Sequence, residues 1–238
     1  MNASTRGLIL LVTFLSVAAC APSGTARDHY EDGYTKLRSG DVDGALSEFN
    51  KAIELAPSRA SPYFGRGQAR QSKNDLAGAV ADYTKAIELK PDFAQAYDMR
   101  GIARAEQGNL VGAIADYNRA IVLNPTSAPP YSNRGLAEFD KGDLDGAIAD
   151  YNRAIKLSPN AAQPYNNRGF AKFHKGDLNG ALADYDRAIE LGPKTVQAYV
   201  NRSVVKRNLG DAGGATADCA KAAELANVVR ARGCSVTE

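Results

Sequence analysis

The sequence predicts an all-α protein, a solenoid of six tandem helix-turn-helix repeats, and three observations carry this prediction. The chain falls into copies of 34 residues without insertion. Each copy carries the same signals for ending one helix, starting a second and stopping it. Apolar residues recur at helical spacing between these signals. Repeats one to six span residues 26–59, 60–93, 94–127, 128–161, 162–195 and 196–229.

The first predicted helix of every repeat ends at a residue that tolerates the left-handed backbone of a helix C-terminus. These residues are Gly40, Asn74, Gly108, Gly142, Gly176 and Gly210. The next residue can cap the N-terminus of a second helix with its side chain. These caps are Asp41, Asp75, Asn109, Asp143, Asp177 and Asp211. A proline then stops the second helix in repeats one to five, whereas repeat six has Asn227.

The second helix of each repeat presents one apolar stripe to the first. In repeat four, Ala147, Tyr151 and Ile155 lie four residues apart and share one face. A small residue on the first helix, such as Gly169, is expected to face an alanine such as Ala181 on the second, so that the two backbones approach closely. A glycine before that alanine in every repeat has no explanation in the sequence, because glycine inside a helix costs about 0.5–1 kcal/mol relative to alanine.

These residues resemble the tetratricopeptide repeat family. The matching positions in repeat five are Tyr165, Gly169, Ala181, Tyr185, Ala188 and Pro193. The resemblance implies a right-handed superhelix whose first helices line a concave groove, and this groove holds peptides in family members. Repeats one and six depart at His29, Ser203 and Cys219, as terminal repeats do because each lacks one neighbour.

The groove of repeats four to six carries the predicted binding residues. Asparagines one residue before the recurring arginine resemble a family ladder that holds a peptide backbone, since an amide offers both a donor and an acceptor. A clamp for C-terminal carboxylates is disfavoured, because its matching positions here contain no lysine. The predicted groove residues are Asn133, Asn166, Asn167, Asn201, Leu136, Phe139, Phe170 and Phe173.

Arginines recur on the first helices and acids on the second helices at even spacing, which is typical of a structural ladder. The arginine ladder consists of Arg66, Arg100, Arg134, Arg168 and Arg202. Repeat one has Asp32 instead of the arginine yet keeps Glu48. We therefore expect each acid to pair with the arginine of the following repeat, as in Asp150 with Arg168.

The first residues of the chain form a separate segment. Arg6 precedes an apolar run at 7–19, which is typical of an export signal. The run is too short to span a bilayer comfortably. The residues at 17–20 resemble the lipobox of bacterial lipoproteins, in which the cysteine, here Cys20, is lipidated and becomes the mature N-terminus.

The sequence thus predicts a lipoprotein signal peptide at 1–19, lipidated Cys20 with a short tether at 20–27, and a tail at 230–238. By the same resemblance, the alanine after Cys20 favours the periplasmic face of the outer membrane. The alternative is an ordinary cleaved signal that releases a soluble protein into the periplasm.

Cys219 and Cys234 leave two alternatives open. An oxidising compartment allows a disulfide between them. A helix running on through Arg232 to Gly233 would instead place the two residues about 20 Å apart along its axis, beyond the reach of a disulfide.

Composition narrows the function. Lys and Arg total 29 against 27 acids, and the two signs are interleaved, so nothing indicates nucleic-acid binding. Two histidines, in repeats one and five, are too far apart to share a metal, and no phosphate loop or nucleophile elbow occurs, so we expect no cofactor and no enzyme.

We expect an adaptor anchored to the bacterial envelope that binds peptide segments of envelope proteins in the groove. By resemblance, such lipoproteins serve protease regulation, pilus or secretin assembly, or cell-wall enzyme complexes. The alternatives are a structural lipoprotein that self-associates and an accessory subunit of one of these assemblies.

Overall fold

The computed structural model describes residues 24–226, which form twelve α-helices. The first three hairpins are α1 (Ala26–Arg38) with α2 (Val42–Leu55), α3 (Ala60–Ser72) with α4 (Leu76–Leu89), and α5 (Ala94–Glu106) with α6 (Leu110–Leu123). The last three are α7 (Ala128–Asp140) with α8 (Leu144–Leu157), α9 (Ala162–His174) with α10 (Leu178–Leu191), and α11 (Val196–Asn208) with α12 (Ala212–Leu225). The predicted all-α solenoid of six helical hairpins is therefore confirmed.

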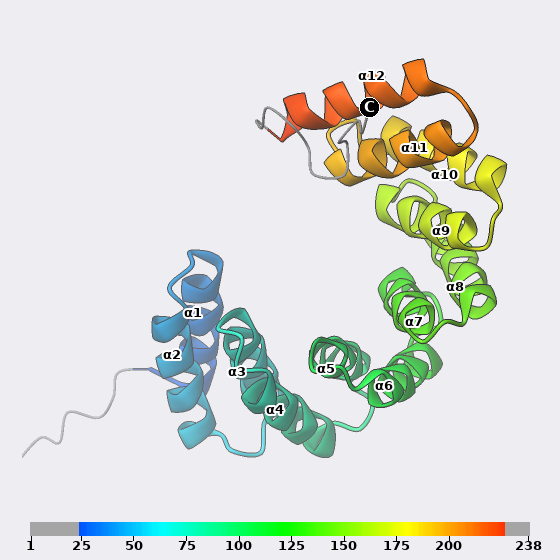
Figure 1. Cartoon of the computed structure of the whole chain (residues 1–238). Coiled ribbons are helices and arrows are strands. Elements are labelled where there is room, and N and C mark those ends of the chain that lie inside the picture. Colours follow the sequence, from blue (N-terminus) through cyan, green and yellow to red (C-terminus); the bar gives the residue numbers. More distant parts are fainter. Residues whose placement is uncertain (1–23, 227–238) are drawn as a thin grey trace, which may run out of the picture.

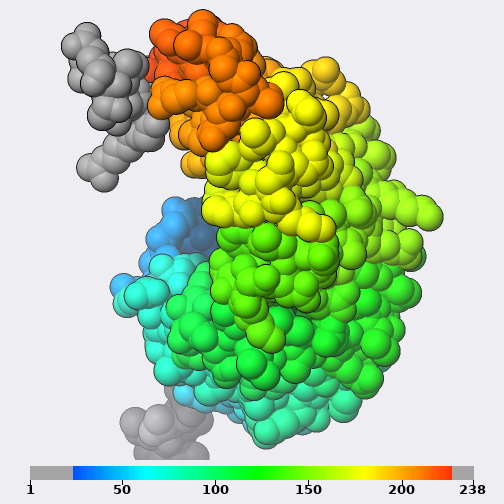
Figure 2. Space-filling view, turned by 45° about the vertical axis from the view of Figure 1, so that its right-hand side comes forward, coloured from blue at the N-terminus to red at the C-terminus, as the bar shows by residue number. Residues whose placement is uncertain are grey.

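The hairpins stack into an open arc. From α3 onward the odd-numbered helices line its inner side and the even-numbered helices its outer side (Figure 1). Consecutive odd-numbered helices contact one another, whereas the described even-numbered helices do not, as curvature toward the odd-numbered side requires. Figure 2 shows the repeats as one continuous surface in sequence order. The inner side of the arc is therefore built from the first helices of the repeats.

The predicted signals act as local physics requires. The turn residue adopts a left-handed backbone in every repeat, with φ of 61° at Asn74 and φ between 80° and 87° at the five turn glycines. The next side chain accepts a hydrogen bond from the backbone N–H three residues on, as Asp143 does from Gly146 at 2.9 Å. The second helix ends at a leucine shortly before each proline, as α8 ends at Leu157. These short-range signals fix where the helices begin and end.

The same cap explains the glycine that the sequence left unexplained. A Cβ on Gly214 would lie 2.1 Å from Oδ2 of the capping residue Asp211. The corresponding Cβ on Gly44 or Gly180 would lie 2.0 Å from its own cap. A side chain here would displace the carboxylate that caps the helix. The glycine is therefore a requirement of the cap geometry.

Replacing Gly214 with alanine is expected to lower the free energy of unfolding by about 0.5–2 kcal/mol, because the cap from Asp211 is lost. Gly213 is the matched control, since its Cβ would meet only Asp211 Oδ1 at 4.0 Å. Gly213→Ala is expected to be neutral or to stabilise by up to about 1 kcal/mol. Urea unfolding of both variants measures the difference, and equal effects would contradict this account of the cap.

The hairpins of repeats one to five each close around an aromatic ring. The Tyr117 side chain is 2% exposed, and its Cε1 would lie 2.5 Å from a Cβ on Gly101 of the facing helix. The glycine therefore makes room for a ring and not, as expected, chiefly for the facing alanine. In repeat six the ring is replaced by Cys219, and the glycine position correspondingly holds Ser203. Glycine thus occupies this position in the repeats where a ring faces it.

The predicted pairing of acids with the arginine of the following repeat is wrong. Arg134 binds Asp150 of its own repeat through Nε and Nη2, both at 2.6 Å. Residues 16 apart face each other across the hairpin, whereas Asp150 and Arg168 do not pair. Repeat one has no arginine at the ladder position, yet its acid Glu48 is paired, because His29 Nδ1 and Lys36 Nζ bind it at 2.6 and 2.9 Å. Hydrogen bonds from Lys36, His29 and Lys51 lower the pKa of Glu48 to about 2.

The arginine ladder still connects neighbouring repeats, through its remaining nitrogen. The Nη1 group of Arg168 donates to Asn152 Oδ1 of the preceding repeat at 2.6 Å. Arg202 donates likewise to Asp186 at 2.7 Å. Each guanidinium therefore closes its own hairpin and holds the previous one.

Two further expectations concern the chain ends. The prediction that the last helix continues toward Gly233 is wrong, because α12 ends at Leu225 with Ala226 as its C-cap. Helix α1 already begins at Ala26, capped by Thr25, so the last two residues of the predicted tether are helical. The signal at 1–19, Cys20, the tether residues 21–23, Cys234 and the tail at 230–238 lie outside the described residues, and the predictions on them stand untested.

Candidate functional site

A hollow of about 220 Å³ lies on the inner side of repeats four to six. We call it the inner groove. It is lined by Leu136, Phe139, Tyr151, Asn166, Asn167, Phe170, Gln197 and Asn201. Six of the eight predicted groove residues are among these. Helices α7, α9 and α11 supply all of them except Tyr151, which comes from α8.

The apolar part of the inner groove is exposed. Leu136 is 50% exposed and Phe170 is 38% exposed. The Phe170 ring lies 5.1 Å from that of Phe139 and 4.6 Å from that of His174, centroid to centroid. These contacts fix the ring while leaving part of its surface open. Such a patch gains free energy when an apolar side chain covers it.

The polar part of the inner groove is a chain of amides. Gln197 Nε2 donates to Asn201 Oδ1 at 2.8 Å, and Asn201 Nδ2 donates to Asn166 Oδ1 at 3.2 Å. Asn166 Nδ2 donates to Asn167 Oδ1 at 3.5 Å. Among the described residues, no acceptor binds the amide nitrogen of Asn167. This series of amides therefore ends in the donor of Asn167, a residue that lines the hollow, and such a donor suits the carbonyl group of a peptide backbone.

Two predicted groove residues lie elsewhere. Asn133 donates to Asp98 Oδ1 at 2.9 Å, and it does not line the inner groove. Phe173 packs against the buried cluster of Ala181, Tyr185 and Val205. Of the predicted asparagine ladder, the structure thus brings together Asn167 and Asn201, with Asn133 one repeat away.

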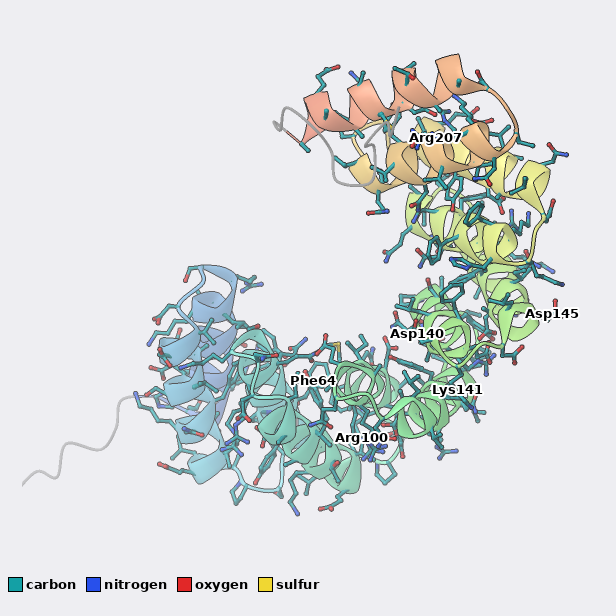
Figure 3. All side chains as sticks on the ribbon, viewed as in Figure 1. Phe64, Arg100, Asp140, Lys141, Asp145 and Arg207 are labelled. Carbon is teal, nitrogen blue, oxygen red and sulfur yellow. The ribbon has the colours of Figure 1, made fainter. Side chains whose placement is uncertain are left out.

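In repeats one to three, aromatic side chains of the first helices pack against other rings of the protein, and a hollow of about 210 Å³ lies beside Tyr30 and Pro62. Tyr30 and Tyr34 pack edge to face with their centroids 5.0 Å apart. Phe64 lies on the side of α3 that faces α5, and its ring lies 4.8 Å from that of Phe93 (Figure 3). Asp98 is half-buried, and burial raises its pKa. The open apolar surface is therefore concentrated in repeats four to six.

Sequence reasoning missed Gln197, Tyr151 and His174. Gln197 lies one helical turn before Asn201, and that spacing could have placed it on the same face. Likewise, His174 lies one turn after Phe170. Tyr151 belongs to the buried stripe of α8, so only the structure reveals that its edge reaches the hollow.

The described part of the chain contains no helix that is both long enough and apolar enough to cross a membrane. Between residues 24 and 226, no three His, Cys, Asp or Glu side chains are grouped so as to hold a metal ion.

Family models match most of the described chain. Models described as "Tetratricopeptide repeat" match residues 30–92, 64–128 and 162–195, and one described as "TPR repeat" matches 135–175. A segment of 43 residues is 49% identical to the "Tetratricopeptide repeat protein 36 homolog" of Nematostella vectensis. That match covers 18% of this chain and only 24% of the relative.

Solved structures share the fold. PilW, described as a "widely conserved type IV pilus biogenesis factor", superposes with a TM-score of 0.78 at 17% identity, over 84% of this chain and 92% of PilW. YrrB, described as "a TPR protein with an unusual peptide-binding site", superposes with a TM-score of 0.59 at 24% identity, over 74% of this chain and 91% of YrrB. At these identities the likeness concerns the fold alone.

Proposed function

Because the chain belongs to the tetratricopeptide repeat family, we propose that it is a protein-interaction adaptor that binds peptide segments of partner proteins in the inner groove. The observation that carries the proposal is the unfilled hollow, in which exposed Leu136 and Phe170 lie beside the donor of Asn167. An apolar side chain of the peptide covers Leu136 and Phe170, and a carbonyl group of the peptide backbone accepts a hydrogen bond from Asn167. The peptide-binding site named for YrrB, which has the same fold, supports this assignment.

The second part of the proposal is the place of action. The export signal at 7–19 and Cys20 support a lipid anchor, which would hold the array at the periplasmic face of the bacterial outer membrane. The five residues at 21–25, between Cys20 and α1, reach about 18 Å at most, so the array would work close to that membrane. Its partners would then be envelope proteins.

Truncating the two exposed apolar residues tests the groove. We expect Leu136→Ala with Phe170→Ala to weaken partner capture at least about tenfold, since each loses roughly 1–2 kcal/mol of apolar contact. Crosslinking pull-downs from native envelopes, quantified by mass spectrometry, measure the loss. The matched control is Val111→Ala with Val122→Ala, two residues of α6 that are 71% and 68% exposed.

The control variant should capture the same proteins as the wild type. Circular dichroism and thermal unfolding check that both variants fold. Equal capture by the groove variant and the control would refute binding in the inner groove, and loss in both would point to the array as a whole.

A further inference from the structure

In all repeats but the fourth, a side chain four residues after the position of the arginine ladder neutralises the buried acid of the hairpin. In five repeats this residue is a cation within 2.9 Å of the acid. The pairs are Lys36 with Glu48, Arg70 with Asp82, Arg104 with Asp116, Lys172 with Asp184, and Lys206 with Asp218. Repeat four has Glu138 in this position. There an acid faces the buried acid.

Glu138 is poorly compensated. Its Oε1 lies 3.8 Å from Arg134 Nε, but that nitrogen donates to Asp150 at 2.6 Å. Its Oε2 is buried and accepts no hydrogen bond from any described residue. An ionised carboxylate oxygen in such a place carries a large desolvation cost.

The charged and titratable groups around Glu138 come from its own hairpin. Arg134 lies on α7, and Asp143, Asp150 and Tyr151 belong to α8 and its cap. Within the described structure, no ion pair joins Glu138 to the neighbouring helices α5, α6 or α9. A single guanidinium, that of Arg134, therefore serves both Glu138 and Asp150.

A proton on Glu138 relieves this imbalance. Burial, followed by the charge of Asp150, raises the pKa of Glu138 to about 7. The protonated carboxyl can donate a hydrogen bond to Asp150, which is among the causes of that raised pKa. The proton then takes the place that a lysine or arginine holds in the other repeats.

We propose that the hairpin α7–α8 is a proton-dependent joint, in which protonated Glu138 holds α7 to α8 and ionised Glu138 loosens them. The hairpin lies in the middle of the arc (Figure 1). Helix α7 also supplies Leu136 and Phe139 to the inner groove. The joint therefore links the solution pH to the packing of the helix that forms one wall of the groove.

The direction of the effect follows from linkage. In the unfolded chain a glutamate has a pKa of about 4.3, below the value of about 7 in the folded protein. The stability contributed by the proton is therefore complete below about pH 4.3 and is lost as the pH rises through about 7. Neutral glutamine at this position removes the dependence.

Hydrogen exchange of the full chain tests the joint. After correction for the intrinsic pH dependence of exchange, we expect α7 and α8 to open about tenfold more in the wild type than in Glu138→Gln at pH 8. At pH 5.5 the two proteins should agree within about twofold, and Glu138→Lys should match Glu138→Gln or exceed its protection at both pH values. An unchanged ratio of wild type to Glu138→Gln between the two pH values would overturn the proposal.

Repeat five offers the converse experiment. Lys172→Glu places an acid opposite Asp184, which Lys172 now contacts at 2.9 Å. We expect α9 and α10 of this variant to open more at pH 8 than at pH 5.5, while α3 and α4 stay unchanged. A folded Lys172→Glu variant without that dependence would contradict the claim that the acid creates the joint; if it does not fold, the comparison with Glu138→Gln decides alone.

Discussion

Replacing Asp116 with alanine is expected to lower the free energy of unfolding by about 3–5 kcal/mol. Asp116 is 3% exposed and accepts from Arg100 Nη2 and Arg104 Nη1, both at 2.7 Å. Its removal leaves two guanidinium groups without their carboxylate, with side chains only 12% and 25% exposed. A charge left unpaired inside a protein is among the most costly single defects.

Urea unfolding measures the loss, with Glu88→Ala as the control. Glu88 pairs with Lys85 at 3.0 Å, but their side chains are 58% and 46% exposed. Such a surface pair contributes less than about 1 kcal/mol. A loss for Asp116→Ala as small as that for Glu88→Ala would mean that the buried acids do not hold the hairpins together.

The effect of Gly101→Ala is expected to change sign with the residue at position 117. In the wild type, the added methyl group collides with the Tyr117 ring, 2.5 Å away, and destabilises by about 1–3 kcal/mol. Tyr117→Ala alone leaves a cavity and costs about 3–5 kcal/mol. In that background Gly101→Ala should stabilise by about 0.5–1 kcal/mol, because the clash is gone and alanine favours the helix.

A double-mutant cycle from urea unfolding gives the coupling between the two positions. Repeat six already carries the corresponding combination of Ser203 with Cys219. If Gly101→Ala destabilises equally with and without the ring, the glycine is needed for something other than the ring.

The helix boundaries could be predicted because their causes are local. The left-handed turn at Asn74 or Gly142 and the cap at Asp143 depend on residues only a few positions apart. The repetition of these signals six times fixed the number of hairpins as well. Six of the eight groove residues could be predicted because the resemblance to the family places the first helices on the inner side and points to the asparagines there.

The pairing of charges could not be predicted in the same way. Asp150 lies 16 residues from Arg134 and 18 from Arg168, and only the packing of the helices decides between them. Retention of Glu48 in repeat one was misleading, since His29 and Lys36 replace the missing arginine. The free donor of Asn167 and the burial of Glu138 depend on which neighbours fill the space, and this requires coordinates.

Site-specific photo-crosslinking tests the central claim, peptide binding in the inner groove, most directly. Benzoylphenylalanine would replace Phe170 in the groove or, as the control, Val122 of α6, which is 68% exposed and does not line the groove. On illumination of native envelopes, we expect discrete adducts with partner proteins from position 170 and none of these from position 122. The same adducts from both positions, or from position 122 alone, would contradict the proposal that the inner groove binds the partners.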